Sequence, residues 1–157
     1  FAGHGMTVFD HGSGETLATS LASAYEDRAP WFGYYWQPTS LLGRYEMVKV
    51  DMGPYDAERH ACIAREDCAD PERTDFQTAD VVTGVTTDFA EREPEIAELM
   101  SEVSFTNEQM NGLLAWQEQN NASAEEVAVK FLSENADVWS AWLNDEAKDN
   151  LAPLLDQ

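Results

Sequence analysis

The chain has few basic side chains. It carries 9 Lys and Arg against 30 Asp and Glu over 157 residues, which gives a formal net charge of −21. Nucleic acids and anionic membranes are bound through basic surfaces, so this balance argues against both as partners. An acidic surface keeps a protein hydrated and mildly attracts cations, but it does not identify a ligand.

Long hydrophobic runs are also missing. No stretch of 18 apolar residues occurs, so the sequence predicts no membrane span. The chain begins at Phe1 without Met and shows no signal peptide, and we therefore expect a processed product or an excised fragment. The hydrophobic fraction of 43% and the five Trp, five Tyr and seven Phe residues predict a folded chain of about one domain.

The signatures of catalysis are absent as well. Ser13 has a glycine on each side, whereas a nucleophile elbow needs Gly-x-Ser-x-Gly. The pair Gly12-x-Gly14 lacks the third glycine of a dinucleotide-binding loop, and the three histidines lie far apart without metal-binding spacing. The sequence therefore predicts a binding protein that is not an enzyme and that needs no metal and no cofactor.

Only two cysteines occur, Cys62 and Cys68, in a polar stretch rich in turn residues. An even pair in such a loop predicts a disulfide that closes a small ring, and with it an oxidising compartment. A metal site would need more ligands, and only His60 lies nearby. A redox site usually shows Cys-x-x-Cys spacing, which this pair does not have.

The residues that are present predict a mixture of strands and helices. Four segments have the composition of strands: residues 7–10, 31–36, 45–52 and 79–87, and the last of these is expected to be buried because it is rich in β-branched residues. Helices are expected at residues 15–28, in a short turn at 38–43 and over most of the chain after residue 88. Residues 53–78 have little periodicity and predict a long loop. This order is typical of an α/β protein whose character changes near residues 46–78.

Two capping boxes mark helix starts in the C-terminal part of the chain. Thr106 with Gln109 opens one helix, and Ser123 with Glu126 opens the next. The second of these helices is expected to continue as far as Trp142. Its tryptophans are interpreted as core or docking residues.

The aromatic segment, residues 31–36, is the most informative stretch of the chain. Every residue in it except Gly33 is aromatic, and Pro38 follows shortly after. A quaternary ammonium group cannot donate a hydrogen bond, so proteins hold it by cation–π attraction to ring faces. Aromatic residues in a strand can equally well fill a core. Strand alternation predicts that Tyr34 and Trp36 share one face and that Tyr35 lies on the other, unless a twist at the strand end brings Tyr35 round.

Ser13 and Gly14 form a small turn at the start of the expected helix 15–28. Free backbone N–H groups at such a start can receive an anionic group of a ligand. Ordinary capping of the helix by the Ser13 side chain is the alternative interpretation.

Motifs that occur in order along the chain carry a family resemblance. They include Gly12-Ser-Gly14, Pro30-Trp-Phe-Gly-Tyr-Tyr-Trp-Gln-Pro-Thr-Ser-Leu-Leu-Gly-Arg-Tyr45, Ala79-Asp-Val-Val-Thr83 and Phe105-Thr-Asn-Glu-Gln-Met-Asn-Gly-Leu-Leu-Ala-Trp116. Together they resemble the substrate-binding proteins of ABC transporters for glycine betaine, proline betaine and choline. The resemblance spans nearly the whole chain, and Tyr34-Tyr-Trp-Gln-Pro-Thr39 is its most specific part.

The resemblance implies a periplasmic-binding-protein fold of the second topological type, with two α/β lobes joined by hinge strands. This chain would correspond to the C-terminal half, with a helix-rich C-terminus. Residues 1–46 would belong to the second lobe and residues 47–78 to the hinge crossing and the disulfide-closed loop. Residues 79–157 would form the C-terminal part of the first lobe.

The resemblance also implies a function in osmoprotection. The protein would capture a quaternary ammonium solute in an aromatic box between the lobes and deliver it in the periplasm to the permease of an ABC importer. Trp36 is the box residue that the resemblance assigns, with Tyr34, Tyr35 and Ser13 as further ligand contacts. The missing N-terminal half or a second copy would be a protein partner. The alternative is an interaction or assembly domain that binds a partner chain or dimerises and has no small-molecule ligand.

Overall fold

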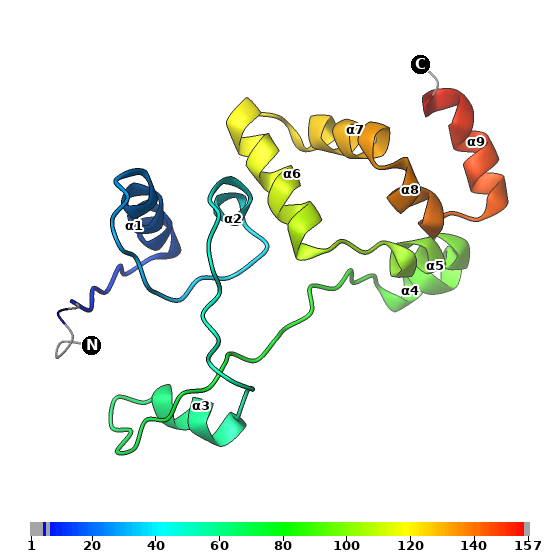
Figure 1. Cartoon of the computed structure of the whole chain (residues 1–157). Helices are drawn as coiled ribbons and strands as arrows, with labels where there is room; N and C mark the ends of the chain where they lie inside the picture. The colour runs from blue at the N-terminus through cyan, green and yellow to red at the C-terminus, as the bar shows by residue number, and fades with distance from the viewer. Residues whose placement is uncertain (1–4, 6, 156–157) are drawn as a thin grey trace. The chain divides into compact units, whose positions relative to one another are not determined.

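The computed structural model describes Gly5 and residues 7–155, with side chains described as far as Leu151. Its helices are labelled in Figure 1. They are α1 (Gly14–Glu26), α2 (Ser40–Arg44), α3 (Ala57–Ile63), α4 (Thr87–Arg92), α5 (Pro94–Glu102), α6 (Asn107–Asn120), α7 (Ala124–Glu134), α8 (Ala136–Trp139), the 3-10 turn η2 (Ser140–Trp142) and α9 (Asp145–Leu155). The chain divides into a first unit, residues 1–46 with 102–157, and a second unit, residues 47–101.

Helix α1 confirms the helix expected at residues 15–28. The Ser13 side chain caps it by accepting a hydrogen bond from the backbone N–H of Thr16 at 3.2 Å. The helix ends at Glu26, two residues early, and Arg28 has a left-handed backbone with φ of 55°. Leu21 points inward and is the most deeply buried large side chain among the described residues.

Helices α2 and α6 pack against each other at very short range in the first unit. A Cβ atom at Gly43 of α2 would lie 2.7 Å from the backbone carbonyl carbon of Asn111 and 2.8 Å from the Cβ of Ala115. Any side chain at residue 43 would therefore collide with the backbone of α6. Ala115 is buried at this contact, and Leu41 of α2 and Tyr45, which directly follows α2, are buried as well.

Both predicted capping boxes are confirmed, at Thr106 with Gln109 and at Ser123 with Glu126. The prediction that the last of these helices continues to Trp142 is wrong, because α7 ends at Glu134 and the chain turns at Asn135.

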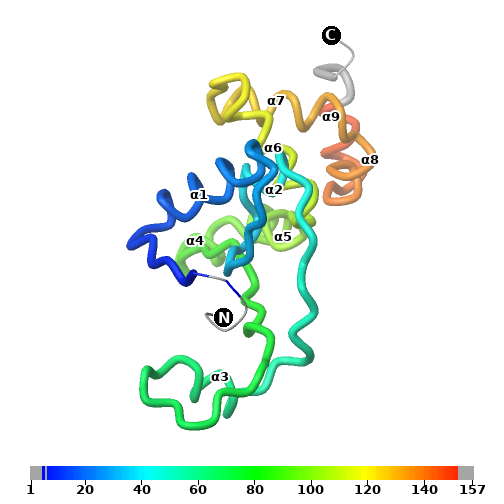
Figure 2. Tube along the Cα trace, turned by 60° about the vertical axis from the view of Figure 1, so that its left-hand side comes forward, coloured from blue at the N-terminus to red at the C-terminus, as the bar shows by residue number. Residues whose placement is uncertain are grey.

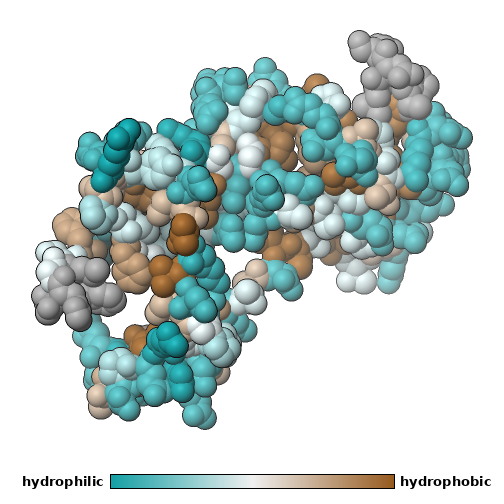
Figure 3. Space-filling model, viewed as in Figure 1, coloured by the Kyte–Doolittle hydropathy of each residue, from teal (hydrophilic) through white to brown (hydrophobic). Residues whose placement is uncertain are grey.

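The break after α7 is fixed by its own hydrogen bonds. The Asn135 Nδ2 donates to the carbonyl oxygen of Phe131 at 3.1 Å, and the Trp139 Nε1 donates to that of Leu132 at 2.7 Å. The Phe131 carbonyl also accepts from the Asn135 backbone N–H at 3.0 Å, so both carbonyl groups in the last turn of α7 are paired. Hydrophobic side chains gather between α6, α7 and α8 (Figure 3).

The second unit has little buried surface. Among its described residues only Thr74 is buried. Two long runs without helix lie on either side of α3 along the chain (Figure 2). They are tied together by an ion pair between Lys49 and Asp75 at 2.7 Å and by a hydrogen bond from the Asp56 N–H to the Thr74 hydroxyl at 2.8 Å.

The disulfide between Cys62 and Cys68 is confirmed. It closes a ring of residues 62–68 that begins in the last turn of α3. Helix α3 itself lies inside the expected loop 53–78. The signal that predicts its start is Asp56, whose side chain accepts hydrogen bonds from the N–H groups of Glu58 and Arg59, each at 3.0 Å.

No β-strand occurs among Gly5 and residues 7–155. The four segments expected as strands have no ladder, and the expectation that residues 79–87 are buried is wrong, because Val81 and Val82 are 89% and 79% exposed. A strand is stable only when a neighbouring strand completes its hydrogen bonds. The α/β class and the hinge strands therefore stay predictions for this chain.

Candidate ligand-binding site

The structure brings Trp36 against the start of α1. A Cβ atom at Gly14 would lie 3.1 Å from the Cη2 and 3.7 Å from the Cζ2 of the Trp36 indole. The ring edge therefore covers the first turn of the helix that Ser13 caps. Two segments that the sequence predicts separately as ligand contacts thus come together, and a side chain at position 14 would have to displace the Trp36 ring by a few tenths of an ångström.

The three predicted aromatic residues form one group of rings. Tyr35 stacks on Trp36, with ring centroids 4.8 Å apart and ring planes 25° apart. The Tyr34 ring is tilted by 31° to that of Trp36, with centroids 6.0 Å apart. Trp36 and Tyr34 are 44% and 51% exposed, so a ligand can reach both. The expected separation of Tyr35 from Trp36 by strand alternation does not hold, because the segment is not a regular strand.

Tyr35 is the half-buried ring of this group, whereas Tyr34 and Trp36 are exposed. Burial raises the pKa of the Tyr35 phenol, a hydrogen bond with the Thr39 side chain lowers it, and the Glu118 carboxylate raises it further. The net shift is upward, so Tyr35 is a neutral phenol at physiological pH. Its stacked ring covers one face of the Trp36 indole.

Asn111 of α6 is a residue that sequence reasoning missed. Its Oδ1 accepts a hydrogen bond from the backbone N–H of Thr39 at 2.6 Å, and its Nδ2 donates to the Oε1 of Gln37 at 3.3 Å. Gln37 directly follows the aromatic segment. Thr39 lies two residues further along, after the cis peptide bond between Gln37 and Pro38. No local pattern reveals this contact, because it joins residues 72 and 74 positions apart.

A second polar network links α1, α2 and α6. The Tyr45 hydroxyl donates to the Glu26 Oε1 at 2.8 Å, and Arg44 forms an ion pair with Glu118 at 2.9 Å. Arg44 also donates to the Tyr45 hydroxyl at 3.2 Å. The hydrogen bond to Glu26 raises the pKa of Tyr45. This network fixes α2 relative to α1 and α6. It thereby restrains residues 37–39, which connect the aromatic segment to α2.

In the part of the chain that the structure describes, no group of three or more His, Cys, Asp or Glu side chains is placed to hold a metal ion. Likewise, none of the described helices combines the length and the apolar character that crossing a membrane requires.

Comparison with protein families identifies the chain. Residues 1–134 match the OpuAC family, described as the substrate binding domain of ABC-type glycine betaine transport system. The chain belongs to this family. The match includes Ser13, Trp36 and the disulfide-closed ring, and it confirms the family resemblance of the motifs. No curated protein matches the chain at a significant level.

Membership sets the general role of the OpuAC chain. The family implies a periplasmic-binding-protein fold and substrate binding for an ABC transporter of glycine betaine. Its members bind a small molecule outside the cytoplasm and pass it to a membrane permease.

Proposed function

We propose that this OpuAC chain binds the quaternary ammonium group of a betaine on the exposed face of Trp36. The observation that carries the proposal is the position of this ring. It is half-exposed, backed by Tyr35 and seated on the first turn of α1. A ring fixed in this way presents one face to a cation without first having to be ordered.

The three aromatic residues have different roles in this proposal. The centroids of Trp36 and Tyr34 are 6.0 Å apart, so one cation can lie within about 6 Å of both. Each such contact contributes about 0.5–2 kcal/mol, more when water is excluded. Tyr35 stacks on the Trp36 indole, so we assign it a supporting role beside the direct ligand contact that the resemblance implies for it.

The start of α1 suits the other end of a betaine. The first N–H groups of a helix lack intrahelical partners and favour an anionic group. Ser13 and Gly14 place these groups beside the Trp36 ring edge, and α1 is 13 residues long. A betaine carboxylate can therefore approach α1 while its ammonium group contacts the rings. Choline has no carboxylate, and we expect it to bind more weakly than glycine betaine or proline betaine.

The remaining parts of the role follow from the family and the resemblance. We propose capture of a compatible solute for osmoprotection, without chemistry or a cofactor, in the periplasm, and transfer to the permease. The α/β two-lobed fold, the hinge crossing at residues 47–78 and the assignment of residues 1–46 and 79–157 to different lobes are parts of the same proposal. So is a partner, the N-terminal half of the protein or a second copy, that supplies the rest of both lobes and completes the aromatic box.

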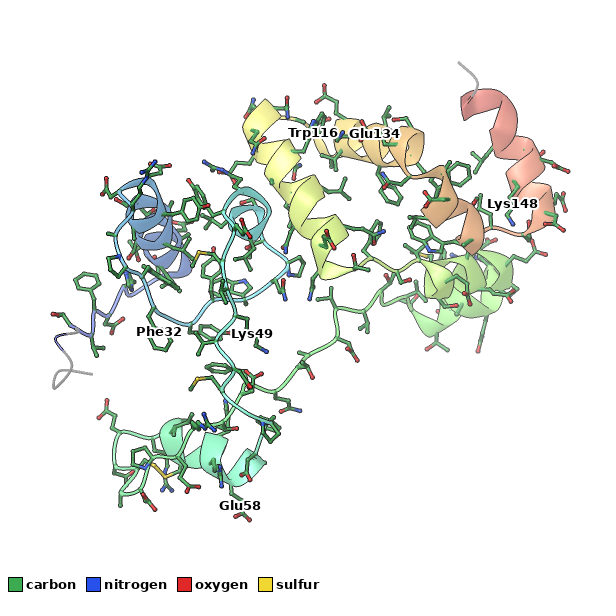
Figure 4. The ribbon with its side chains drawn as sticks, in the orientation of Figure 1. Phe32, Lys49, Glu58, Trp116, Glu134 and Lys148 are labelled. Carbon is green, nitrogen blue, oxygen red and sulfur yellow. A yellow bond between two sulfur atoms is a disulfide. The ribbon has the colours of Figure 1, made fainter. Side chains whose placement is uncertain are left out.

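Calorimetric titration of the chain with glycine betaine, proline betaine and choline tests this proposal. We expect binding heat with both betaines and, in Trp36→Ala, affinity weaker by about tenfold or more, since two ring contacts are lost or disturbed. Trp116→Ala is the matched control. Trp116 lies on the side of α6 that faces α7 (Figure 4), where the Lys130 Nζ is 5.1 Å from its ring centroid.

Unchanged affinity in Trp36→Ala would contradict the site. Equal losses in both variants would do the same, because they would indicate a general effect on folding. The absence of heat with every ligand is the result that the alternative function, an assembly domain without a small-molecule ligand, predicts.

A further inference from the structure

Asn111 is a buried polar residue in the middle of a helix. Its exposed fraction is 8%, and it lies in the second turn of α6, whose neighbouring inward position is Ala115. Asparagine is a poor helix former, and a buried amide is costly unless both its oxygen and its nitrogen are bonded. Here both are bonded, to Thr39 and Gln37. Packing of α6 against α2 does not need these bonds, because the close approach of Gly43 to the Asn111 backbone and to Ala115 already supplies it.

The bonds of Asn111 lead directly to the aromatic rings. Thr39, which donates its N–H to Asn111, also caps α2 by accepting a hydrogen bond from the Leu42 N–H at 3.4 Å. Gln37, the second partner of Asn111, directly follows Trp36 in the chain, and the Thr39 side chain lies close enough to the Tyr35 phenol to lower its pKa. Tyr35 in turn stacks on Trp36. A continuous series of contacts therefore runs from the rigid backbone of α6 to the ring that carries the ligand.

We infer that Asn111 is a positioning residue for the ligand site, which sets the place of the Tyr35–Trp36 stack by holding Thr39 and Gln37 to α6. It does not contact the ligand. The expected effect of Asn111 on ligand affinity rests on the proposed function. Its effect on the Trp36 ring is independent of any ligand.

The experiment compares three variants of the full chain. Asn111→Leu keeps the size of the side chain and favours the helix, but removes both hydrogen bonds. Asn111→Asp keeps an oxygen that can accept from the Thr39 N–H. Asn120→Leu is the matched control, because Asn120 is an exposed asparagine of the same helix whose Nδ2 donates to the Trp116 carbonyl oxygen at 2.8 Å. Circular dichroism verifies that each variant is folded.

Two readouts are measured on each variant. The first is the affinity for glycine betaine. The second is the ¹⁹F spectrum of chain labelled with 5-fluorotryptophan, in which the five tryptophans give separate signals and Trp36→Phe identifies that of Trp36. The second readout needs no ligand, and a merely structural role of Asn111 would not move the Trp36 signal selectively.

We expect Asn111→Leu to weaken glycine betaine binding by about tenfold or more and to shift or broaden the Trp36 signal while the Trp116 signal stays in place. Asn111→Asp should recover most of both properties, and Asn120→Leu should change neither. An unmoved Trp36 signal in Asn111→Leu would overturn the inference, as would equal shifts of all five signals. If the unsubstituted chain binds no betaine, the proposed function fails, and the ¹⁹F signals alone then decide whether Asn111 positions Trp36.

Discussion

All five tryptophans lie in the first unit, and both cysteines lie in the second. The first unit has a small apolar core, formed by Leu21, Leu41, Tyr45, Ala115, Phe131 and Trp139. The described part of the second unit buries only Thr74 and instead has a disulfide and the ion pairs of Lys49 with Asp75 and of Arg59 with Glu72.

This difference indicates why the aromatic group belongs to the first unit. A ring that binds a cation must be held in place before the ligand arrives, and close packing provides this. The second unit is stabilised by covalent and charged links between neighbouring segments, which restrain the backbone but do not fix large side chains. We therefore expect the two units to respond to different substitutions.

The largest expected effect is in the first unit, at the contact of α2 with α6. Gly43→Ala places a methyl group against the backbone of Asn111, and the loss of stability should be about 3 kcal/mol, the upper end for overpacking, because backbone atoms cannot turn away. Urea unfolding followed by tryptophan fluorescence measures it. Gly112→Ala in α6 is the control: nothing lies within 4 Å of its Cβ position, so it should stabilise the helix by about 0.5–1 kcal/mol. Equal behaviour of the two variants would contradict the close packing.

The next effect is in the second unit. Replacing Cys62 and Cys68 together by serine opens a short ring, which should lower local stability by about 2 kcal/mol. Hydrogen exchange of residues 57–76 should become faster. The urea midpoint detected by tryptophan fluorescence should not change, because every tryptophan lies in the first unit. A tryptophan-detected midpoint that falls together with the protection of residues 57–76 would show that the two units do not respond separately.

The smallest effects are on titration, and they have opposite signs in the two units. The hydrogen bond from Lys49 lowers the pKa of Asp75, so its contribution is present above about pH 4 and is lost as pH falls through the lowered pKa. The hydrogen bond to Glu26 raises the pKa of Tyr45, so its contribution is present below about pH 10 and is lost as pH rises through the raised pKa.

Two single substitutions measure these shifts. In Lys49→Ala, an NMR titration should find the Asp75 pKa higher than in the unsubstituted chain. In Glu26→Gln, the Tyr45 pKa should be lower. Each substitution is the control for the other, because the two pairs lie in different units. A pKa of Asp75 that stays low without Lys49 would show that the ion pair is not its main cause.

Features with a local cause could be predicted from the sequence. The caps at Ser13, Thr106 and Ser123 depend on residues three positions away, and the disulfide depends on two cysteines in one loop. The break at Asn135 was missed because apolar residues continue at helical spacing beyond it. The expected strands have β-branched and aromatic residues, but a ladder also needs a partner strand, which the composition of a segment cannot supply.

The candidate site was predicted only in part. The sequence indicates the aromatic segment and the turn at Ser13, and the structure brings Trp36 and Gly14 together. The roles of Trp36, Tyr34, Tyr35 and Ser13 in ligand binding stay predictions. The support from Asn111 could not be predicted, since it joins residues 72 and 74 positions apart, and the stacking of the neighbours Tyr35 and Trp36 departs from the strand alternation that their sequence favours.

The central claim is that Trp36 holds a positive charge, and a matched pair of ligands tests it most directly. Glycine betaine and tert-butylacetate have nearly the same shape and the same carboxylate, but only the first has a cationic head group. Calorimetric titration should find glycine betaine bound about tenfold or more tightly than tert-butylacetate, and Trp36→Ala should abolish most of this preference. Equal affinity for the two ligands, or a preference that persists in Trp36→Ala, would contradict the claim.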